Sequence, residues 1–440
     1  MYPLHFAVTP LFAFLLLGQA AYAAPVITKQ ALHQDIDLVL RTVRERHPDV
    51  GFSTSDAAVT AALQAIGRDL APSMTRNEAW RQLARINPLL ADGHLAITLT
   101  DWRADTAAHR AAGGVLFPFD VAFDPQGRLV IDAALGGAAS PLTGARIVAI
   151  DGVPVDTLVA SLASRVHGDT PTMRMALLAQ RWWLYYWKTL GAAPQYRLVI
   201  ERDGLRSELA IPGSTDQPRM LQDEVDIARL YRLDTVPGCS AVLTVNAFDS
   251  AHLADFVAFT QAAFTRMQQE QIRHLVIDIR ANTGGDDVMW LDGLMPYLAT
   301  ARYRTGSSAV KRVLRANPER GEQVGQIIHT QIATWREPQP DHPARFSGKV
   351  DVAIGPLTYS SSVLFANVMQ DFGFATLVGS GGAARRSQSG GVYGVPLPQS
   401  GLTLWIPRFV LDPPGGAPKG ALLSAQGPWD PRAVPACQAL

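Results

Sequence analysis

The sequence has no excess of either charge. Its 440 residues include 39 basic and 39 acidic side chains, so the formal net charge is zero. Proteins that bind nucleic acid through bulk charge need surplus Lys and Arg to displace counterions, so this class is excluded. A disordered or acidic solvating chain is excluded too, because 48% of the residues are hydrophobic and only 18% are charged. A chain of this length can bury a large core and form two or three domains.

Lysine and cysteine are scarce. Only five lysines occur in the chain, so few are available as a catalytic base: Lys29, Lys188, Lys311, Lys349 and Lys419. The two cysteines, Cys239 and Cys437, give neither a disulfide framework nor the spacing of metal ligands. They either pair in an oxidising compartment or remain separate thiols.

Long hydrophobic runs are absent outside the first residues. Phe6 to Leu17 is almost wholly apolar but too short to span a bilayer, and Ala21-Tyr22-Ala23 has the small-x-small pattern of a signal-peptidase site. We therefore predict a cleaved signal peptide over 1–23 and a periplasmic or secreted protein without a stable membrane span. An uncleaved anchor is the alternative, because the first 23 residues contain no Lys or Arg.

The rest of the chain divides into three regions by pattern. Helical periodicity predicts an N-terminal helical domain over 24–112, which ends in an Asp-Gly-His turn and a short strand. Turn-rich β patterns predict a β domain with a helical insertion over 113–215. Strands alternate with helices over 216–440, which is typical of a layered, largely parallel sheet. The predicted fold class is therefore α/β.

One aromatic run lies in the helical insertion. Residues 181–187 read Arg-Trp-Trp-Leu-Tyr-Tyr-Trp and are apolar around most of a helix. Such a run is either buried between domains or exposed as a platform for substrate.

Two strand–helix junctions in the last region carry unusual residues. The first, 278–287, places Gly284 and Gly285 after a buried strand, where backbone N–H groups can point at a ligand or the chain can simply turn tightly. The second, 354–371, opens an apolar helix with three serines. A serine there is either an N-cap or a nucleophile at a helix start that favours negative charge.

Three motifs resemble the tail-specific protease family, the carboxyl-terminal processing serine peptidases of bacteria. Ser140–Val155 resembles the carboxyl half of a PDZ domain, Leu275–Gly285 resembles the family's D-L-R-x-N-x-G-G motif, and Leu357–Gly382 resembles its nucleophile segment. The resemblance implies a ClpP/crotonase-like α/β core, with an N-terminal helical region and a PDZ-like β module. The interphotoreceptor retinoid-binding protein is related to the same core.

The resemblance also implies positions for the site. Ser360 falls on the nucleophile, and the backbone N–H groups of Gly284 and Ser361 fall on the donors to the oxyanion. Asp371 falls on the family's helix-borne Asp and is a candidate supporting residue. Arg385 stands where one branch has a Lys base; an arginine stays protonated and cannot accept the proton, so its candidate role is also supporting.

His94 is the candidate base. Asp92-Gly93-His94 matches the segment that supplies His in a Ser–His–Glu branch, yet no Glu follows Ser360 anywhere in the chain. His94 therefore accepts the proton of Ser360, or is a structural His at the turn, or binds a metal. If it is the base, it should lie within about 3 Å of the Ser360 hydroxyl. Activity should then rise with pH through a group near ~6.5.

The predicted function is that of an exported serine peptidase of the tail-specific protease type. Its PDZ-like module would collect an extended peptide or protein substrate, or the carboxyl end of one. No metal and no cofactor is implied. A binding protein for a small lipophilic ligand or peptide is the alternative on the same fold, and a hydrolase of non-peptide esters would use the same residues.

Overall fold

A computed structural model describes residues 26–430 as a mixed α/β protein with several sheets. The predicted signal peptide, 1–23, lies outside the described residues, and so does Cys437 with its candidate pairing to Cys239. Within the described part, no helix combines the length and apolar character that crossing a membrane requires.

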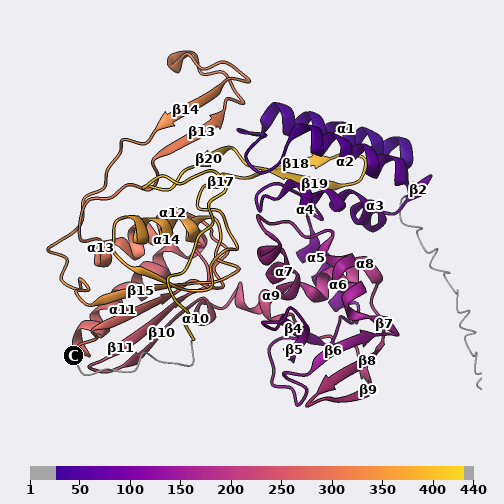
Figure 1. Ribbon diagram of the computed structural model, residues 1–440, viewed down its shortest axis with the longest axis horizontal. Helices are drawn as coiled ribbons and strands as arrows, with labels where there is room; N and C mark the ends of the chain where they lie inside the picture. The colour runs from indigo at the N-terminus through magenta and orange to yellow at the C-terminus, as the bar shows by residue number, and fades with distance from the viewer. Residues whose placement is uncertain (1–25, 431–440) are drawn as a thin grey trace, which may run out of the picture.

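The N-terminal region is helical, as its periodicity predicts, and forms the indigo part of Figure 1. Thr28 and Ser55 cap the first two helices, and Thr75 with Glu78 forms a capping box at the start of the third. The helices are α1 (Lys29–Arg46), α2 (Asp56–Asp69), α3 (Arg76–Leu83), α4 (Asn87–Leu90) and α5 (Trp102–Ala111).

The middle region is a mainly antiparallel sheet with three inserted helices. The strands are β4 (Phe119–Phe123), β5 (Leu129–Ala134), β6 (Arg146–Ile150), β7 (Val153–Pro154), β8 (Gln195–Arg202) and β9 (Leu205–Pro212). The helices are α6 (Val155–Ala163), α7 (Pro171–Gln180) and α8 (Trp182–Leu190). Trp182, Trp183 and Tyr186 are buried, so the aromatic run is core and not a platform for substrate.

The C-terminal region is built on a five-stranded sheet. Its order is β10-β11-β12-β15-β16, with parallel pairing from β11 onward, as the alternating pattern predicts. Figure 1 shows the helices of this region gathered beside the sheet. The strands are β10 (Tyr231–Val236), β11 (Ser240–Val245), β12 (His274–Asp278), β15 (Lys349–Ile354) and β16 (Thr376–Gly379). The helices are α11 (Leu253–Gln269), α12 (Asp287–Gly293), α13 (Met295–Leu298) and α14 (Ser361–Asp371).

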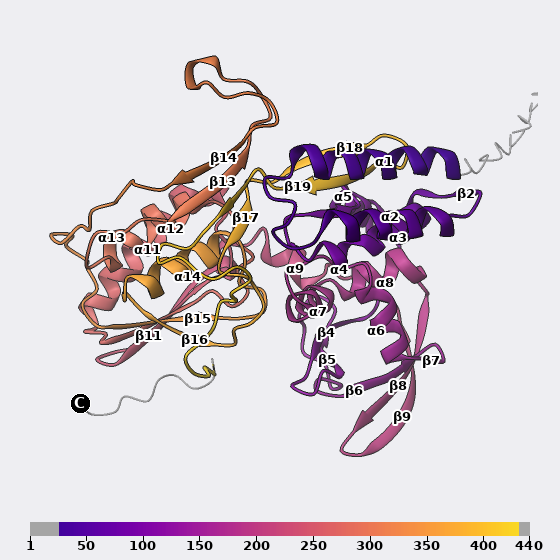
Figure 2. The same ribbon diagram turned by 45° about the horizontal axis from the view of Figure 1, so that its top comes forward.

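Two smaller sheets complete the C-terminal region, and one of them includes a strand from the N-terminal region. One has the order β14-β13-β20-β17 and includes the hairpin of β13 (Ser308–Arg312) and β14 (Ile327–Gln331), which projects from the molecule in Figures 1 and 2. Its other strands are β20 (Phe409–Leu411) and β17 (Gln388–Gly390).

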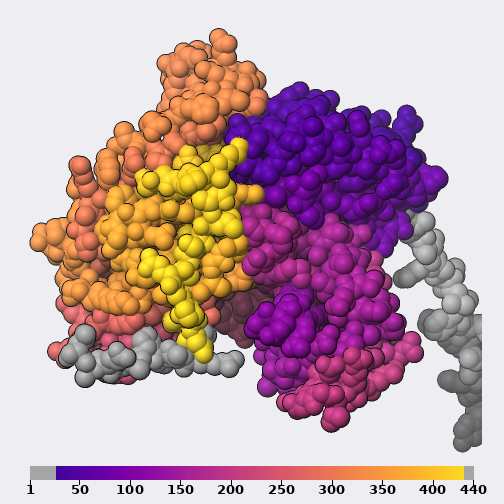
Figure 3. All heavy atoms as spheres, viewed as in Figure 1, coloured from indigo at the N-terminus to yellow at the C-terminus, as the bar shows by residue number. Residues whose placement is uncertain are grey.

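The other small sheet joins the two ends of the chain. It has the order β18-β19-β3 and combines β18 (Tyr393–Leu397) and β19 (Leu402–Ile406) with β3 (Ala96–Thr98). Antiparallel pairing places Thr98 opposite Thr403, and Figure 3 shows the indigo N-terminal surface meeting the orange and yellow C-terminal surface. This sheet fixes the turn at His94, two residues before β3, against the C-terminal region.

Candidate active site

Ser360 stands between a buried strand and a buried helix. It follows β15 after a short turn and immediately precedes α14, whose first nine residues are all buried. Its φ of 55° and ψ of −127° lie in a region that L-residues rarely adopt, at a typical cost of about 1–3 kcal/mol. A sharp strand-to-helix turn of this kind presents a serine hydroxyl at the edge of a sheet. Ser360 occupies the N-cap position of α14 but makes no side-chain capping hydrogen bond, so its hydroxyl is not used as a cap.

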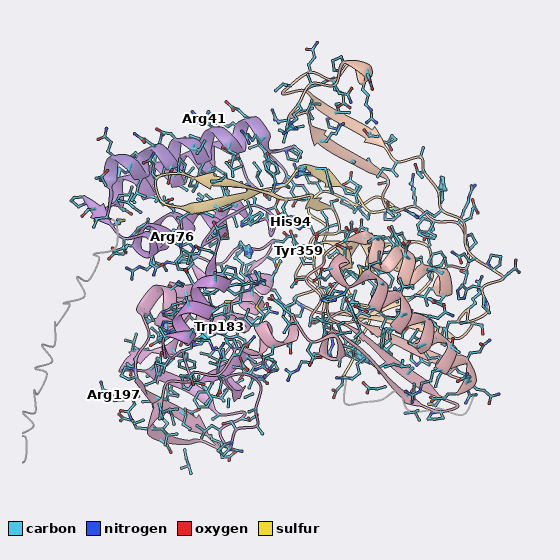
Figure 4. All side chains as sticks on the ribbon, turned by 180° about the vertical axis from the view of Figure 1, so that it is seen from behind. Arg41, Arg76, His94, Trp183, Arg197 and Tyr359 are labelled. Atoms are coloured by element: carbon cyan, nitrogen blue, oxygen red, sulfur yellow. The ribbon has the colours of Figure 1, made fainter. Side chains whose placement is uncertain are left out.

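His94 faces the Ser360 hydroxyl. Its Nε2 lies 3.1 Å from Ser360 Oγ, so the two groups are as close as the sequence analysis requires although 266 positions separate them. The backbone N–H of His94 donates to Asp92 Oδ1 at 2.8 Å, which closes the turn that carries the imidazole. The imidazole also stacks at a tilt on the ring of Tyr359, with 4.8 Å between ring centroids, and Figure 4 shows the two residues side by side between the two halves of the molecule.

A serine links His94 to a carboxylate. Ser389, in β17, places its Oγ 3.1 Å from His94 Nδ1 and donates to Asp92 Oδ1 at 2.7 Å. An ionised carboxylate only accepts hydrogen bonds, so the single hydroxyl proton of Ser389 points to Asp92, and its oxygen accepts from His94 Nδ1–H. This direction leaves the lone pair of Nε2 facing Ser360, which is the tautomer that a general base needs.

Burial and nearby polar groups determine the protonation states of Asp92 and His94. Burial alone would raise the pKa of Asp92, but the His47 and His94 imidazoles beside it and the Ser389 hydroxyl outweigh this and lower it to about 2. Burial lowers the pKa of His94 below its ordinary value, and the Asp92 charge offsets only part of the effect. At neutral pH the site therefore holds a neutral imidazole next to an ionised carboxylate.

A second buried carboxylate, Asp169, supports the turn from the other side. Its Oδ1 accepts from the Tyr359 hydroxyl at 2.9 Å and from the Gly93 N–H at 3.1 Å, and its Oδ2 accepts from the Arg385 N–H at 2.9 Å. Burial and the nearby Asp92 charge raise the pKa of Asp169 to about 6.

Arg385 contacts this support and not the hydroxyl of Ser360. Its Nη1 donates to the Ala91 carbonyl at 2.6 Å and lies 3.6 Å from Asp169 Oδ1. The residue at the position of the Lys base therefore holds the turn before His94 in place.

The two predicted oxyanion donors differ in their surroundings. The Ser361 N–H, at the start of α14, has no hydrogen-bond acceptor among residues 26–430. The Gly284 N–H donates to Asn282 Oδ1 at 2.8 Å and is therefore engaged. Gly284 packs directly against the nucleophile, since a Cβ there would lie 2.6 Å from Ser360 Cβ, and its φ is 102°. Only glycine fits at this position.

Asp371 lies away from the site. It ends α14, and at 1.5 Å per residue this eleven-residue helix places it about 15 Å from Ser360. Its Oδ1 accepts from Arg386, and its Oδ2 accepts from the Gly415 N–H at 2.8 Å. Asp371 therefore anchors a C-terminal loop and does not support the Ser360–His94 pair. Across residues 26–430, no three His, Cys, Asp or Glu side chains are arranged to hold a metal ion.

The C-terminal part of the chain carries a family signature. Residues 240–404 match the family model of peptidase family S41. This match confirms, for the C-terminal part of the chain, the resemblance drawn from the sequence motifs. The S41 match contains Ser360 and Ser389, whereas His94 and Asp169 precede it, so the site combines the S41 region with two earlier parts of the chain.

Solved structures resemble nearly the whole chain. Mature CPAF in complex with lactacystin has a TM-score of 0.65 and 14% identity, and the alignment covers 92% of this chain and 95% of that chain. Mature CPAF has a TM-score of 0.63 with 15% identity, over 92% and 94% of the two chains. The photosystem II D1 C-terminal processing protease has a TM-score of 0.48 with 15% identity, over 92% and 94%. Identities at this level show likeness of fold alone. No curated protein matches the sequence.

Proposed function

We propose that the protein is a serine peptidase in which Ser360 is the nucleophile and His94 is the general base. One observation carries the proposal: a hydroxyl on a strained strand-to-helix turn lies 3.1 Å from an imidazole whose free lone pair faces it. The S41 match of the region that contains Ser360 supports a peptidase over other hydrolases.

The geometry supports acyl transfer in two steps. Ser360 Oγ attacks the peptide carbonyl while His94 Nε2 takes its proton, and His94 then returns the proton to the leaving amine. The Ser361 N–H, which is free at the helix start, stabilises the oxyanion, and the Gly284 N–H joins it once Asn282 releases it. Water, activated by the same imidazole, then cleaves the acyl-enzyme.

Asp92 replaces the Glu that orients the His in the Ser–His–Glu branch. The imidazolium that forms on His94 is stabilised by the buried, ionised Asp92 through the Ser389 hydroxyl. Asp92 and Ser389 act through His94, so we assign them as positioning residues. Asp169 and Arg385 hold the same turn from its other side.

Substrate selection is proposed for the middle region, as a PDZ-like module appended to a ClpP/crotonase-like core. A cavity of about 870 Å³ is lined by edge strand β4, helix α7 and the open face of the five-stranded sheet. Phe123, Met175 and Leu357 supply apolar lining, and two ion pairs, Arg232–Asp234 and Arg280–Asp278, also line the cavity. An edge strand beside a helix suits an extended peptide, which adds to the strand through its backbone. The carboxyl end of a protein would pair with these arginines in place of Asp234 or Asp278. We place the enzyme in the periplasm or outside the cell.

A fluorophosphonate probe and an unfolded protein substrate test the proposal together. We expect the probe to label Ser360, and we expect Ser360→Ala to lose labelling and at least ~10³-fold in hydrolysis rate. Ser362→Ala is the matched control, because Ser362 Oγ donates to the Asn282 carbonyl inside α14's buried start and does not face His94.

Two results would overturn this assignment. Full activity in Ser360→Ala with loss in Ser361→Ala would move the nucleophile by one position. No labelling of the wild-type protein, together with stabilisation by a small lipophile, would favour a binding protein on the same fold.

A further inference from the structure

A second large cavity lies between the N-terminal helices and the projecting hairpin. This groove has a volume of about 1330 Å³ and runs between the C-terminal end of α1, the β13–β14 hairpin and strand β20. Figures 1 and 2 show the hairpin standing beside the end of α1. The floor of the groove is apolar and consists of Ala309, Val313, Phe409 and Leu411. We call it the basic groove, after the charges of its rim.

The rim of the basic groove is cationic in a protein with no net charge. Five basic side chains line it against two acidic ones: Arg46, Lys311, Arg312, Arg315 and Arg408, against Glu45 and Glu322. Lys311 pairs with Glu322 at 2.8 Å, and Arg312 donates to the His47 carbonyl at 2.9 Å. Arg46, Arg315 and Arg408 form no ion pair with any residue of 26–430, and all three are exposed. The groove therefore presents three unneutralised guanidinium groups around an apolar floor.

Sheet pairing connects the groove with the nucleophile. Gln388 lies opposite Leu411, Leu411 opposite Ala309, and Ala309 opposite Thr330. Residues directly opposite in a sheet point to the same face, so the Gln388 side chain shares the face that forms the floor of the groove. Gln388 Oε1 in turn accepts from the Ser360 N–H at 3.1 Å. With strands about 4.8 Å apart, Ala309 lies about 10 Å from Gln388, which an extended peptide spans in about three residues.

We propose that the basic groove binds an acidic segment of the polypeptide substrate, about three to six residues from the scissile bond. This inference rests on the proposed function and names the substrate class of that site. Arg46, Arg315 and Arg408 would pair with Asp or Glu carboxylates, which guanidinium groups bind in a bidentate manner. The apolar floor would accept the side chains between them.

Matched peptides test the preference for acid. Each peptide carries one neutral cleavable core and a run of three identical residues, which are all Glu, all Gln or all Lys. In the first set the run lies three to six positions before the core, and in the second set it lies three to six positions after the core. We expect kcat/KM for one Glu placement to exceed that of its Gln twin by about three- to tenfold, and the ratio to fall as salt rises. The variant Arg315→Glu with Arg408→Glu should bring the ratio to one or below.

The control variant is Arg197→Glu with Arg206→Glu, which makes the same charge change on β8 and β9. Both arginines are exposed in the middle region, and Figure 4 shows Arg197 far from the hairpin. This variant should keep the Glu-to-Gln ratio of the wild type. Equal ratios in all three proteins, with Ser360-dependent cleavage of the Gln peptide, would overturn the groove assignment and leave the peptidase assignment standing.

Binding to the Ser360→Ala protein tests the groove without catalysis. Fluorescence anisotropy should show the Glu peptide binding several-fold more tightly than the Gln peptide, and the Arg315→Glu, Arg408→Glu changes should remove the difference. Absence of hydrolysis with this binding preference intact would overturn the peptidase function and not the groove. Equal affinities would overturn the groove.

Discussion

At the scale of single residues, the hydroxyl of Ser389 decides how the imidazole of His94 is used. The Ser389 hydroxyl has a single proton, which it donates in the hydrogen bond to Asp92. Its oxygen must therefore accept the hydrogen bond from the Nδ1–H of His94. A methyl group in its place would leave the imidazole free to adopt the other tautomer, with Nε2 protonated and unable to accept from Ser360.

We therefore predict that Ser389→Ala lowers kcat by about 10- to 100-fold and leaves KM unchanged, because the loss falls on the transition state. Ser389→Thr, which keeps a hydroxyl, should restore most of the rate. Ser387→Ala is the control, since Ser387 is also buried but donates to Asp412 at 2.7 Å. Equal losses in Ser387→Ala and Ser389→Ala would show that both serines act only on the fold.

The pH dependence follows from the burial of His94. Catalysis needs the neutral imidazole, so activity is lost as the pH falls through the pKa of His94. Since burial lowers this pKa below its ordinary value, we expect the midpoint to lie below the ~6.5 predicted from the sequence. We predict more than half of the maximal kcat/KM at pH 6.5 and an acid limb with a lower midpoint, measured on a neutral peptide. A midpoint at or above 6.5 would contradict the buried, neutral imidazole.

The sequence was sufficient to select Ser360 and His94 as candidates that the fold brings within 3.1 Å, because both lie in motifs of contiguous residues. It could not select Ser389 or Asp169, which lie 295 positions after and 75 positions after His94 and belong to no motif. Ser and Asp are common residues in many roles, and only the folded chain shows which of them meet an imidazole. Asp371 is the opposite case: it lies within a motif, but the folded chain places it away from Ser360, where it anchors a C-terminal loop.

At the scale of elements, strand β3 holds the turn that carries His94 to the C-terminal region. The Asn87 side chain holds this strand through two hydrogen bonds to Ile97. Its Oδ1 accepts from the Ile97 N–H at 2.8 Å, and its Nδ2 donates to the Ile97 carbonyl at 3.0 Å. The Asn87 side chain is buried and also donates to the Arg165 carbonyl at 3.0 Å.

We predict that Asn87→Ala lowers the free energy of unfolding by about 3 kcal/mol, because it leaves buried backbone groups of Ile97 and Arg165 without partners. Probe labelling of Ser360 should slow as well, since β3 positions His94. Asn246→Ala, which removes a more exposed hydrogen bond to the Arg229 carbonyl, should cost less than about 1 kcal/mol in urea unfolding. An Asn87→Ala protein as stable as Asn246→Ala would contradict this role of Asn87.

The sequence predicted the long secondary-structure elements with a periodic apolar pattern, and it did not predict the short ones. Strands β12 and β15 and helix α14 lie where the two strand–helix junctions, 278–287 and 354–371, indicate buried strands and an apolar helix. Strands β17 and β20 have three residues each, and the β13–β14 hairpin is largely exposed, so none of them has a pattern that periodicity can detect. These are the strands that carry Ser389 and form the basic groove.

At the scale of the whole molecule, one continuous hydrophobic core runs from Leu32 to Leu423 and includes residues of all three regions. We predict a single cooperative transition in urea, in which intrinsic fluorescence, far-ultraviolet circular dichroism and Ser360 probe labelling share one midpoint. Loss of labelling well before loss of secondary structure would show that the N-terminal region separates first.

The pairing of β3 with β19 also has a consequence for the order of events during synthesis. The ribosome makes His94 early and Ser360 266 residues later, and β19 follows another 42 positions after Ser360. A partly made chain thus has an imidazole without a hydroxyl to activate, and then a hydroxyl without a fixed imidazole. Under the proposed mechanism, peptidase activity requires β19 to pair with β3, so we expect a partly made chain to cleave neither itself nor its neighbours.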